Sequence, residues 1–166
     1  MRIVYTSDLH GNQQHYARVL HFAIEQGARA VMLGGDLFPN SHEPGRGLLL
    51  QRQFVRDVFA PWLHRIRAEF RSLSVYALPG NEDWASTTDL LVDLAESELF
   101  YPLHHRVWRL NGRTWLAGSS LVQSNPAGTI YVFHSPPYAT ALDRLPMAER
   151  SAAAPCAPSS RSTSRR

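Results

Sequence analysis

The sequence predicts an α/β fold, in which the first half of the chain builds a parallel β-sheet and the second half is richer in strands. In the first half, three short apolar runs rich in β-branched and aromatic residues alternate with two stretches of helical periodicity. Each of these runs ends in glycine and polar residues. A β-α-β-α-β order predicts parallel strands joined by right-handed crossovers.

The first strand and helix follow from residue type and spacing. Arg2–Thr6 holds β-branched and aromatic residues, which favour a strand. Gln13–Gln26 is predicted to be helical, because its apolar residues recur at i, i+3, i+4 and i+7, at Tyr16, Val19, Leu20 and Ala23. Gly27 then provides a C-terminal stop.

The second strand and helix are predicted at Ala30–Leu33 and Leu48–Phe70, separated by a loop of turn-forming residues from Pro39 to Gly47. The helix carries one apolar side, made of Phe54, Val58, Trp62, Ile66 and Phe70. Pro61 lacks a backbone N–H, so it should kink or divide this helix.

The remaining elements begin with a third strand, Ser74–Leu78, and a helix from about Thr88 to Ala95. Two short strands then flank Asn111-Gly112, a strong hairpin signal. A last strand is predicted at Ile130–Phe133.

Length and composition indicate one globular domain. The chain has 166 residues, enough to bury a core, and 44% of them are hydrophobic. No apolar run approaches the length of a membrane span, and the N-terminus lacks the features of a signal peptide. A single cysteine excludes an intrachain disulfide framework, and these three observations together lead us to expect a cytoplasmic protein.

The charge distribution gives no sign of a nucleic-acid-binding face. All 17 basic residues are arginine, and three of them lie in the last 16 residues, which contain no acid. The rest of the chain is formally neutral, whereas nucleic-acid binding needs clustered positive charge. From Ser151 onward the chain holds only Ser, Ala, Pro, Thr, Arg and one Cys, so we expect residues 147–166 to be a disordered tail.

Residues with metal-ligand chemistry follow four of the predicted strands. Asp8 and His10 come after the first strand, Asp36 after the second, Asn81 after the third and His134 after the last. In a parallel sheet these strand ends lie along one edge, where open α/β sheets bind their ligands. A mixed set of oxygen and imidazole ligands suits Mn, Fe, Zn or Ni, and one shared carboxylate suits a pair of metal ions.

The motifs DLHGN, GGDLF, PGNED and FHSPP, in this order, resemble those of the calcineurin-like metallophosphoesterase family. The resemblance covers residues 1–146, which we take as the metallophosphoesterase domain. It implies a sandwich of two β-sheets flanked by helices (α/β/β/α), with its C-terminal part missing here. It also implies an enzyme that hydrolyses phosphate esters with two divalent metal ions.

The resemblance also implies roles for single residues. Asp8 and His10 would bind the first metal, Asp36 would bridge both, and Asn81 and His134 would bind the second. A hydroxide bridging the metals would attack phosphorus in line. The catalytic set is expected to be Asn81, Glu82 and Asp83. Asn12 and Tyr138 are expected to contact the phosphate-ester substrate.

Two departures from the family pattern bear on activity. The usual G-N-H is G-N-E here, so Glu82 replaces the histidine that assists the leaving group. A glutamate acts as a general acid only where burial or a negative neighbour, such as Asp83, favours its protonated form. We therefore expect phosphodiesters or activated monoesters as substrates. The terminal G-H-x-H is also absent, since no histidine follows His134, and each metal would lack one protein ligand.

The composition of the last residues suggests a frameshift near residue 150, because wrong frames of a GC-rich gene read as Ala, Pro, Arg and Ser.

Two functions other than phosphate-ester hydrolysis stay open. One is a non-catalytic phosphoesterase-like scaffold or inactive remnant. The other is a nucleotide-binding βαβ domain without metal, although the glycines match neither G-x-G-x-x-G nor the P-loop pattern. Taken singly, Asp8, Asp36 and Asn81 could also be turn or helix-cap residues.

Overall fold

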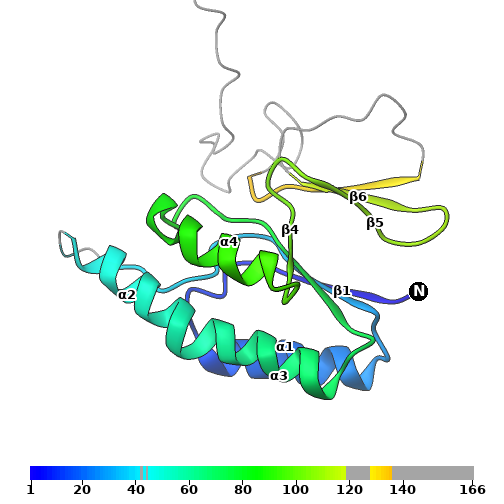
Figure 1. Cartoon of the computed structure of the whole chain (residues 1–166), viewed down its shortest axis with the longest axis horizontal. Helices are drawn as coiled ribbons and strands as arrows, with labels where there is room; N and C mark the ends of the chain where they lie inside the picture. The colour runs from blue at the N-terminus through cyan, green and yellow to red at the C-terminus, as the bar shows by residue number, and fades with distance from the viewer. Residues whose placement is uncertain (42, 44, 119–127, 136–166) are drawn as a thin grey trace, which may run out of the picture. The chain divides into compact units, whose positions relative to one another are not determined.

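A computed structural model describes residues 1–41, 43, 45–118 and 128–135 (Figure 1). The chain divides into two compact units, Met1–His134 and Ser135–Arg166, and every helix and strand given below belongs to the first. The tail expected at residues 147–166 and the candidate substrate contact Tyr138 lie outside the described residues.

The first sheet contains four parallel strands in the order β1-β2-β3-β4. They are β1 (Ile3–Thr6), β2 (Ala30–Leu33), β3 (Ser74–Ala77) and β4 (Tyr101–Pro102). The first three confirm the predicted strands and their parallel pairing. The fourth was not predicted, because it contains only two residues, one of them a proline.

The helix α1 (Gln13–Glu25) confirms the predicted first helix. The side chain of Asn12 caps its N-terminus by accepting hydrogen bonds from the backbone N–H groups of Gln14 and His15, at 3.0 and 3.4 Å. Gly27 follows in the left-handed region, with φ of +57°. The buried members of its predicted apolar stripe are Tyr16, Leu20 and Ala23.

The long second helix is divided, as Pro61 predicted. It consists of α2 (Arg46–Phe54), a π-helical segment η1 (Val55–Phe59) and α3 (Ala60–Glu69), with Pro61 in the first turn of α3. A π-segment shifts the phase of the residues that follow it. Of the predicted apolar side, Phe54 and Ile66 are buried, whereas Val58, Trp62 and Phe70 are only partly buried. The deeply buried positions that the α-helical spacing missed are Val55, Phe59 and Leu63.

The second sheet has the order β5-β6-β7 and comprises β5 (Val107–Arg109), β6 (Trp115–Gly118) and β7 (Thr129–Val132). The pair β5–β6 is antiparallel, which confirms the predicted hairpin. The side chain of Asn111 stabilises the turn between β5 and β6, because its Oδ1 accepts hydrogen bonds from the N–H groups of Arg113 and Thr114 at 2.8 and 2.9 Å. The strand β7 pairs in parallel with β6.

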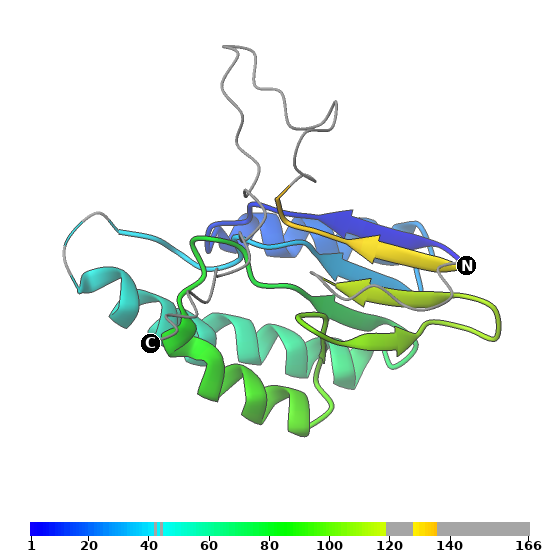
Figure 2. The same cartoon turned by 90° about the horizontal axis from the view of Figure 1, so that it is seen from above.

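Two apolar clusters join these elements into layers (Figures 1 and 2). Helices cover one face of the first sheet over an aromatic core, which we define as the rings of Tyr16, Phe38, Phe54, Phe59, Trp62 and Phe100. The second cluster lies between the sheets and includes Met32, Tyr76, Leu103, Leu116 and Val132. Since both faces of β2 are covered, all four of its residues are buried.

The layer order helix–sheet–sheet confirms the two-sheet α/β fold. The helical layer expected beyond the second sheet is not among the described residues.

The chain also has a short 3₁₀ turn, η2 (Ala85–Thr87), that leads into α4 (Thr88–Glu96), close to the predicted helix. Within the described part of the chain, no helix is long and apolar enough to cross a membrane.

Candidate metal centre

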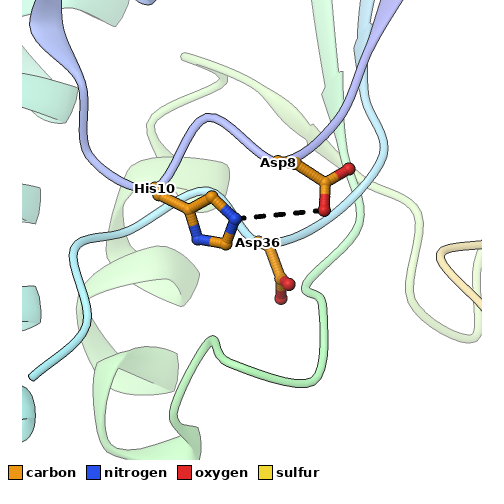
Figure 3. Close-up of side chains that lie close together, drawn as sticks. All are labelled: Asp8, His10 and Asp36. Carbon is orange, nitrogen blue, oxygen red and sulfur yellow. Dashed lines mark ion pairs between the residues drawn. The ribbon is translucent and has the colours of Figure 1, made fainter. Parts of the chain in front are cut away.

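Asp8, His10 and Asp36 converge where β1 and β2 end (Figure 3). One ligand atom from each lies within 4.8 Å of the other two, and His10 Nε2 is 4.0 Å from Asp8 Oδ1. Asp36 is buried, whereas Asp8 and His10 are exposed to solvent. The three predicted ligands of these two strands therefore form one cluster that is open to solvent on one side.

The backbone at all three residues is in the left-handed region, with φ of 57° at Asp8, 46° at His10 and 51° at Asp36. This conformation costs of order 1–3 kcal/mol for each residue other than glycine and often marks functional sites. Hydrogen bonds between the two loops hold it, since the N–H groups of Asp8 and His10 donate to the carbonyls of Gly35 and Asp36, both at 2.9 Å. This backbone conformation thus directs the side chains of Asp8, His10 and Asp36 toward one point.

His134 completes the other side of the cluster. Its Nδ1 lies 2.9 Å from the carbonyl oxygen of Gly34, and its Nε2 lies 2.9 Å from Asn81 Oδ1 and 3.3 Å from Asp36 Oδ2. Asp36 therefore lies between Asp8 and His10 on one side and Asn81 and His134 on the other. This is the position that a carboxylate shared by two ions requires.

The hydrogen-bonding roles at His134 support a cation at this point. A carbonyl oxygen only accepts, so Nδ1 of His134 carries a hydrogen and, in the neutral ring, Nε2 carries a lone pair. That lone pair faces oxygens of Asn81 and Asp36, which also present lone pairs. A metal ion bound at Nε2 would have these two oxygens as neighbouring ligands, and metal-binding histidines commonly donate their second N–H to a backbone carbonyl. The residues present therefore fit a divalent metal.

Two glycines allow the loops to approach each other this closely. A Cβ on Gly80 would overlap the backbone nitrogen and Oδ1 of Asp36, and a Cβ on Gly35 would overlap the ring of His134. Gly35 of the GGD motif and Gly80 of the PGN motif are therefore required by packing around Asp36 and His134.

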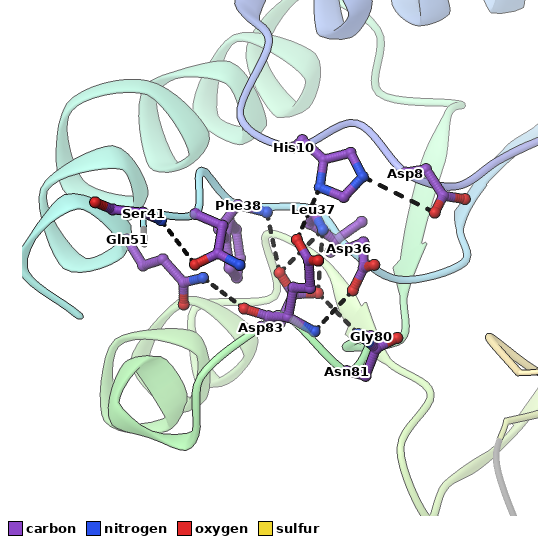
Figure 4. Close-up of polar contacts among 12 residues, drawn as sticks. Asp8, His10, Asp36, Leu37, Phe38, Ser41, Gln51, Gly80, Asn81 and Asp83 are labelled. Carbon is purple, nitrogen blue, oxygen red and sulfur yellow. Dashed lines mark hydrogen bonds and ion pairs between the residues drawn. The ribbon is translucent and has the colours of Figure 1, made fainter. Parts of the chain in front are cut away.

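The carboxylate of Asp83, a predicted catalytic residue, accepts hydrogen bonds from backbone N–H groups (Figure 4). It accepts from the N–H groups of Leu37, Phe38 and Gly80 at 2.9, 3.0 and 2.8 Å. Burial raises the pKa of this carboxyl, and the three N–H donors oppose that shift. Asp83 therefore ties the loop after β2 to the loop after β3.

Gln51 is a site residue that the sequence did not reveal. Its side chain is fully buried on α2, where Nε2 donates to the carbonyl of Glu82 at 2.7 Å (Figure 4). Its Oε1 accepts from the N–H of Trp84 at 2.9 Å. Glutamine is common on helices, so no signal in the sequence sets this one apart.

Two adjacent histidines, His104 and His105, follow the unpredicted strand β4. The turn Leu103–Arg106 closes with a 3.0 Å bond from the N–H of Arg106 to the carbonyl of Leu103, and His105 has φ of 52°. The rings of His104 and His105 are 4.0 Å apart. These histidines therefore lie beyond β4, at the edge where the metal ligands follow the other strands of the sheet.

Asn12, expected to contact substrate, serves as the cap of α1 described above.

Two known relatives of this chain are one solved structure and one protein family. One solved structure, the crystal structure of TT1561 of Thermus thermophilus, is similar over 79% of this chain and 56% of that chain, with 16% sequence identity and a TM-score of 0.49. This chain therefore spans little more than half of the length of that protein. No curated protein matches the sequence. A sequence model described as calcineurin-like phosphoesterase matches residues 1–153, most of the chain. The chain therefore belongs to the calcineurin-like phosphoesterase family.

Proposed function

We propose that this chain hydrolyses phosphodiesters or activated phosphate monoesters at a centre of two divalent metal ions. The observation that carries the proposal is the convergence of two ligand groups on Asp36, with Asp8 and His10 in one cluster with it and His134 at 3.3 Å. Membership of a family of metal-dependent phosphoesterases supports the same reaction class.

The ligands would divide around the shared carboxylate. Asp8 and His10 would hold one ion, Asn81 and His134 the other, and Asp36 both. Bound Mn, Fe, Zn or Ni ions would supply a hydroxide nucleophile at neutral pH and neutralise charge on the phosphoryl oxygens. The exposed sides of Asp8 and His10 leave room for a substrate to enter from solvent.

The class of ester follows from the residue after Asn81. Glu82 stands where the family pattern has a histidine that assists the leaving group. Its side chain is 37% exposed and lies against His10, 3.4 Å from Nδ1. Esters with good leaving groups need little protonation as the bond breaks, so diesters and activated monoesters suit this centre better than alkyl monoesters.

A non-catalytic metal-binding scaffold is the second candidate. The sequence supports it, because Glu82 stands where the family pattern has the histidine that assists the leaving group. For either function we propose the cytoplasm as location, because the single cysteine, Cys156, suits a reducing compartment.

The test is hydrolysis of bis(p-nitrophenyl) phosphate by the full chain with Mn²⁺, compared with phenyl phosphate as an unactivated monoester. We expect the diester to be cleaved faster and Asp36→Asn to abolish the reaction. Hydrolysis of neither ester while Mn²⁺ binds tightly would favour the scaffold. Equal rates for wild type and Asp36→Asn would contradict the proposed centre.

A further inference from the structure

We propose that Glu82 is a positioning residue for the metal centre: its carboxylate orients the His10 imidazole, and its backbone holds Asp36. This inference deepens the proposed function and rests on it for metal binding. It gives Glu82 a role different from proton transfer to the leaving group, the role of the histidine that it replaces in the family pattern.

Glu82 makes three polar contacts, and each has a different partner. Its N–H donates to Asp36 Oδ1 at 2.9 Å, and its carbonyl accepts from the buried Gln51 at 2.7 Å. Its Oε2 lies 3.4 Å from Nδ1 of His10. Glu82 therefore contacts His10 in the loop after β1 and Asp36 in the loop after β2. Gln51 of α2 fixes the backbone of Glu82 through its carbonyl.

The two nitrogens of His10 face different carboxylates. Nε2 faces Asp8, at 4.0 Å from Oδ1, on the side of the metal cluster, whereas Nδ1 faces Glu82. A carboxylate beside Nδ1 favours the tautomer with hydrogen on that nitrogen, which leaves the lone pair of Nε2 free for a metal. Metal-binding histidines are commonly oriented and made more basic by such an outer carboxylate.

The same arrangement makes Glu82 a poor choice for the leaving-group acid. A general acid must present its proton to the substrate. Here the carboxylate is directed at His10, and its backbone is fixed at both ends by Asp36 and Gln51. The structure therefore gives the glutamate of the G-N-E motif a function that needs no proton transfer to the leaving group.

The chain contains a matched pair for a control. On α1, His21 Nε2 lies 3.1 Å from Glu25 Oε1, with both side chains exposed. Glu82→Ala and Glu25→Ala each remove a glutamate from beside a histidine, but only the first does so at the metal centre. Glu82→Gln is a second variant that keeps the length of the side chain and removes its charge.

The experiment measures histidine tautomers by ¹H–¹⁵N NMR in the metal-free full-length chain, and Mn²⁺ affinity by titration. We expect His10 to carry its hydrogen on Nδ1 in the wild type and to lose this bias in Glu82→Ala. The Kd for Mn²⁺ should rise roughly 10- to 100-fold, as for other outer-shell partners, with a smaller rise in Glu82→Gln. Glu25→Ala should change His21 alone and leave the Kd unchanged.

Hydrolysis separates the two roles of Glu82. A positioning residue predicts that saturating Mn²⁺ restores the rate of Glu82→Ala, and that the loss of rate below saturation is the same for good and poor leaving groups. A loss that grows as the leaving group becomes poorer, and that excess Mn²⁺ does not restore, would overturn the inference. An unchanged His10 tautomer in Glu82→Ala would also overturn it.

These readouts distinguish failure of the inference from failure of the proposed function. If the wild-type chain binds no Mn²⁺, the proposed function is wrong, and the tautomer measurement, which needs no metal, still decides whether Glu82 orients His10.

Discussion

The aromatic core and the metal centre lie on the same four-stranded sheet, yet they use their residues in different ways. In the aromatic core, large side chains from helices and loops pack against one another, and Phe59 contacts four rings, those of Tyr16, Phe38, Trp62 and Phe100. At the metal centre, polar side chains extend from loops in which Asp8, His10 and Asp36 have positive φ. The comparison indicates that burial in the first region stabilises the strained backbone of the second.

The largest effect should come from Phe59→Ala in the aromatic core. The side chain is fully buried, so its loss removes apolar burial and leaves a cavity that should cost about 3–5 kcal/mol of unfolding free energy. Urea denaturation of this variant and of Phe22→Ala, whose side chain is 51% exposed, gives the measurement. Similar losses for both variants would show that the core does not provide the stability assigned to it.

Gly80→Ala should have the next largest effect, because it acts where the two loops meet. The added Cβ would overlap the backbone and carboxylate of Asp36, and such overpacking costs about 1–3 kcal/mol. Mn²⁺ binding should weaken as well, since Asp36 must move. Gly112→Ala in the β5–β6 turn is the control, because nothing lies within 4 Å of its Cβ position. Equal behaviour of the two variants would contradict the packing argument.

Asp36→Asn should separate function from stability. The amide oxygen can still accept from the N–H of Glu82, so unfolding free energy should change by no more than about 1 kcal/mol. The Kd for Mn²⁺ should rise by more than about 100-fold, because a direct ligand matters more than an outer-shell partner. Calorimetric titration with Mn²⁺ measures this, and wild-type affinity in the variant would remove Asp36 from the centre.

The smallest effect concerns the ion pair between α2 and α4. Arg52 donates to both carboxylate oxygens of Asp89, at 2.7 and 2.8 Å, and lowers the pKa of Asp89 from 3.8 to about 2. Because the folded-state pKa is depressed, the stabilisation is present above pH 3.8 and is lost as pH falls through about 2. Asp89→Asn should therefore lower the urea midpoint slightly at pH 7 and leave it unchanged near pH 2. Asp93→Asn, on the same helix but outside this pair, is the control, and a pH-independent difference would contradict the assignment.

The sequence predicted the fold where local pattern and tertiary packing agree. The stripe of α1 repeats at helical spacing and Asn12 caps the helix, so the predicted end differs by one residue and three of the four stripe residues are buried, with Val19 partly buried. The phase change at Val55–Phe59 was missed, because a π-helical segment leaves no signature in apolar spacing, even though Pro61 indicated a break. The strand β4 escaped prediction because its pairing with β3 depends on tertiary contact rather than on its two residues.

The candidate site was predictable as far as its residues follow strands. Asp8 and Asp36 could be placed at one edge because parallel strands end together. His134 follows β7 in the second sheet, so the expectation of a single parallel sheet was wrong for it, and its position beside Asp36 depends on the packing of the two sheets. Gln51 could not be placed, since its role depends on helix α2 lying against the loop after β3. The contact of Glu82 with His10 joins residues far apart in the sequence and is fixed by backbone hydrogen bonds that no motif records.

The most direct test of the metal centre is the metal content of the full chain after purification with Mn²⁺ and desalting. The account predicts about two tightly held ions per chain, as a two-metal centre requires, and fewer in Asp36→Asn. Less than about half an ion per wild-type chain would contradict it, and would mean that the ligands converge without forming a metal centre.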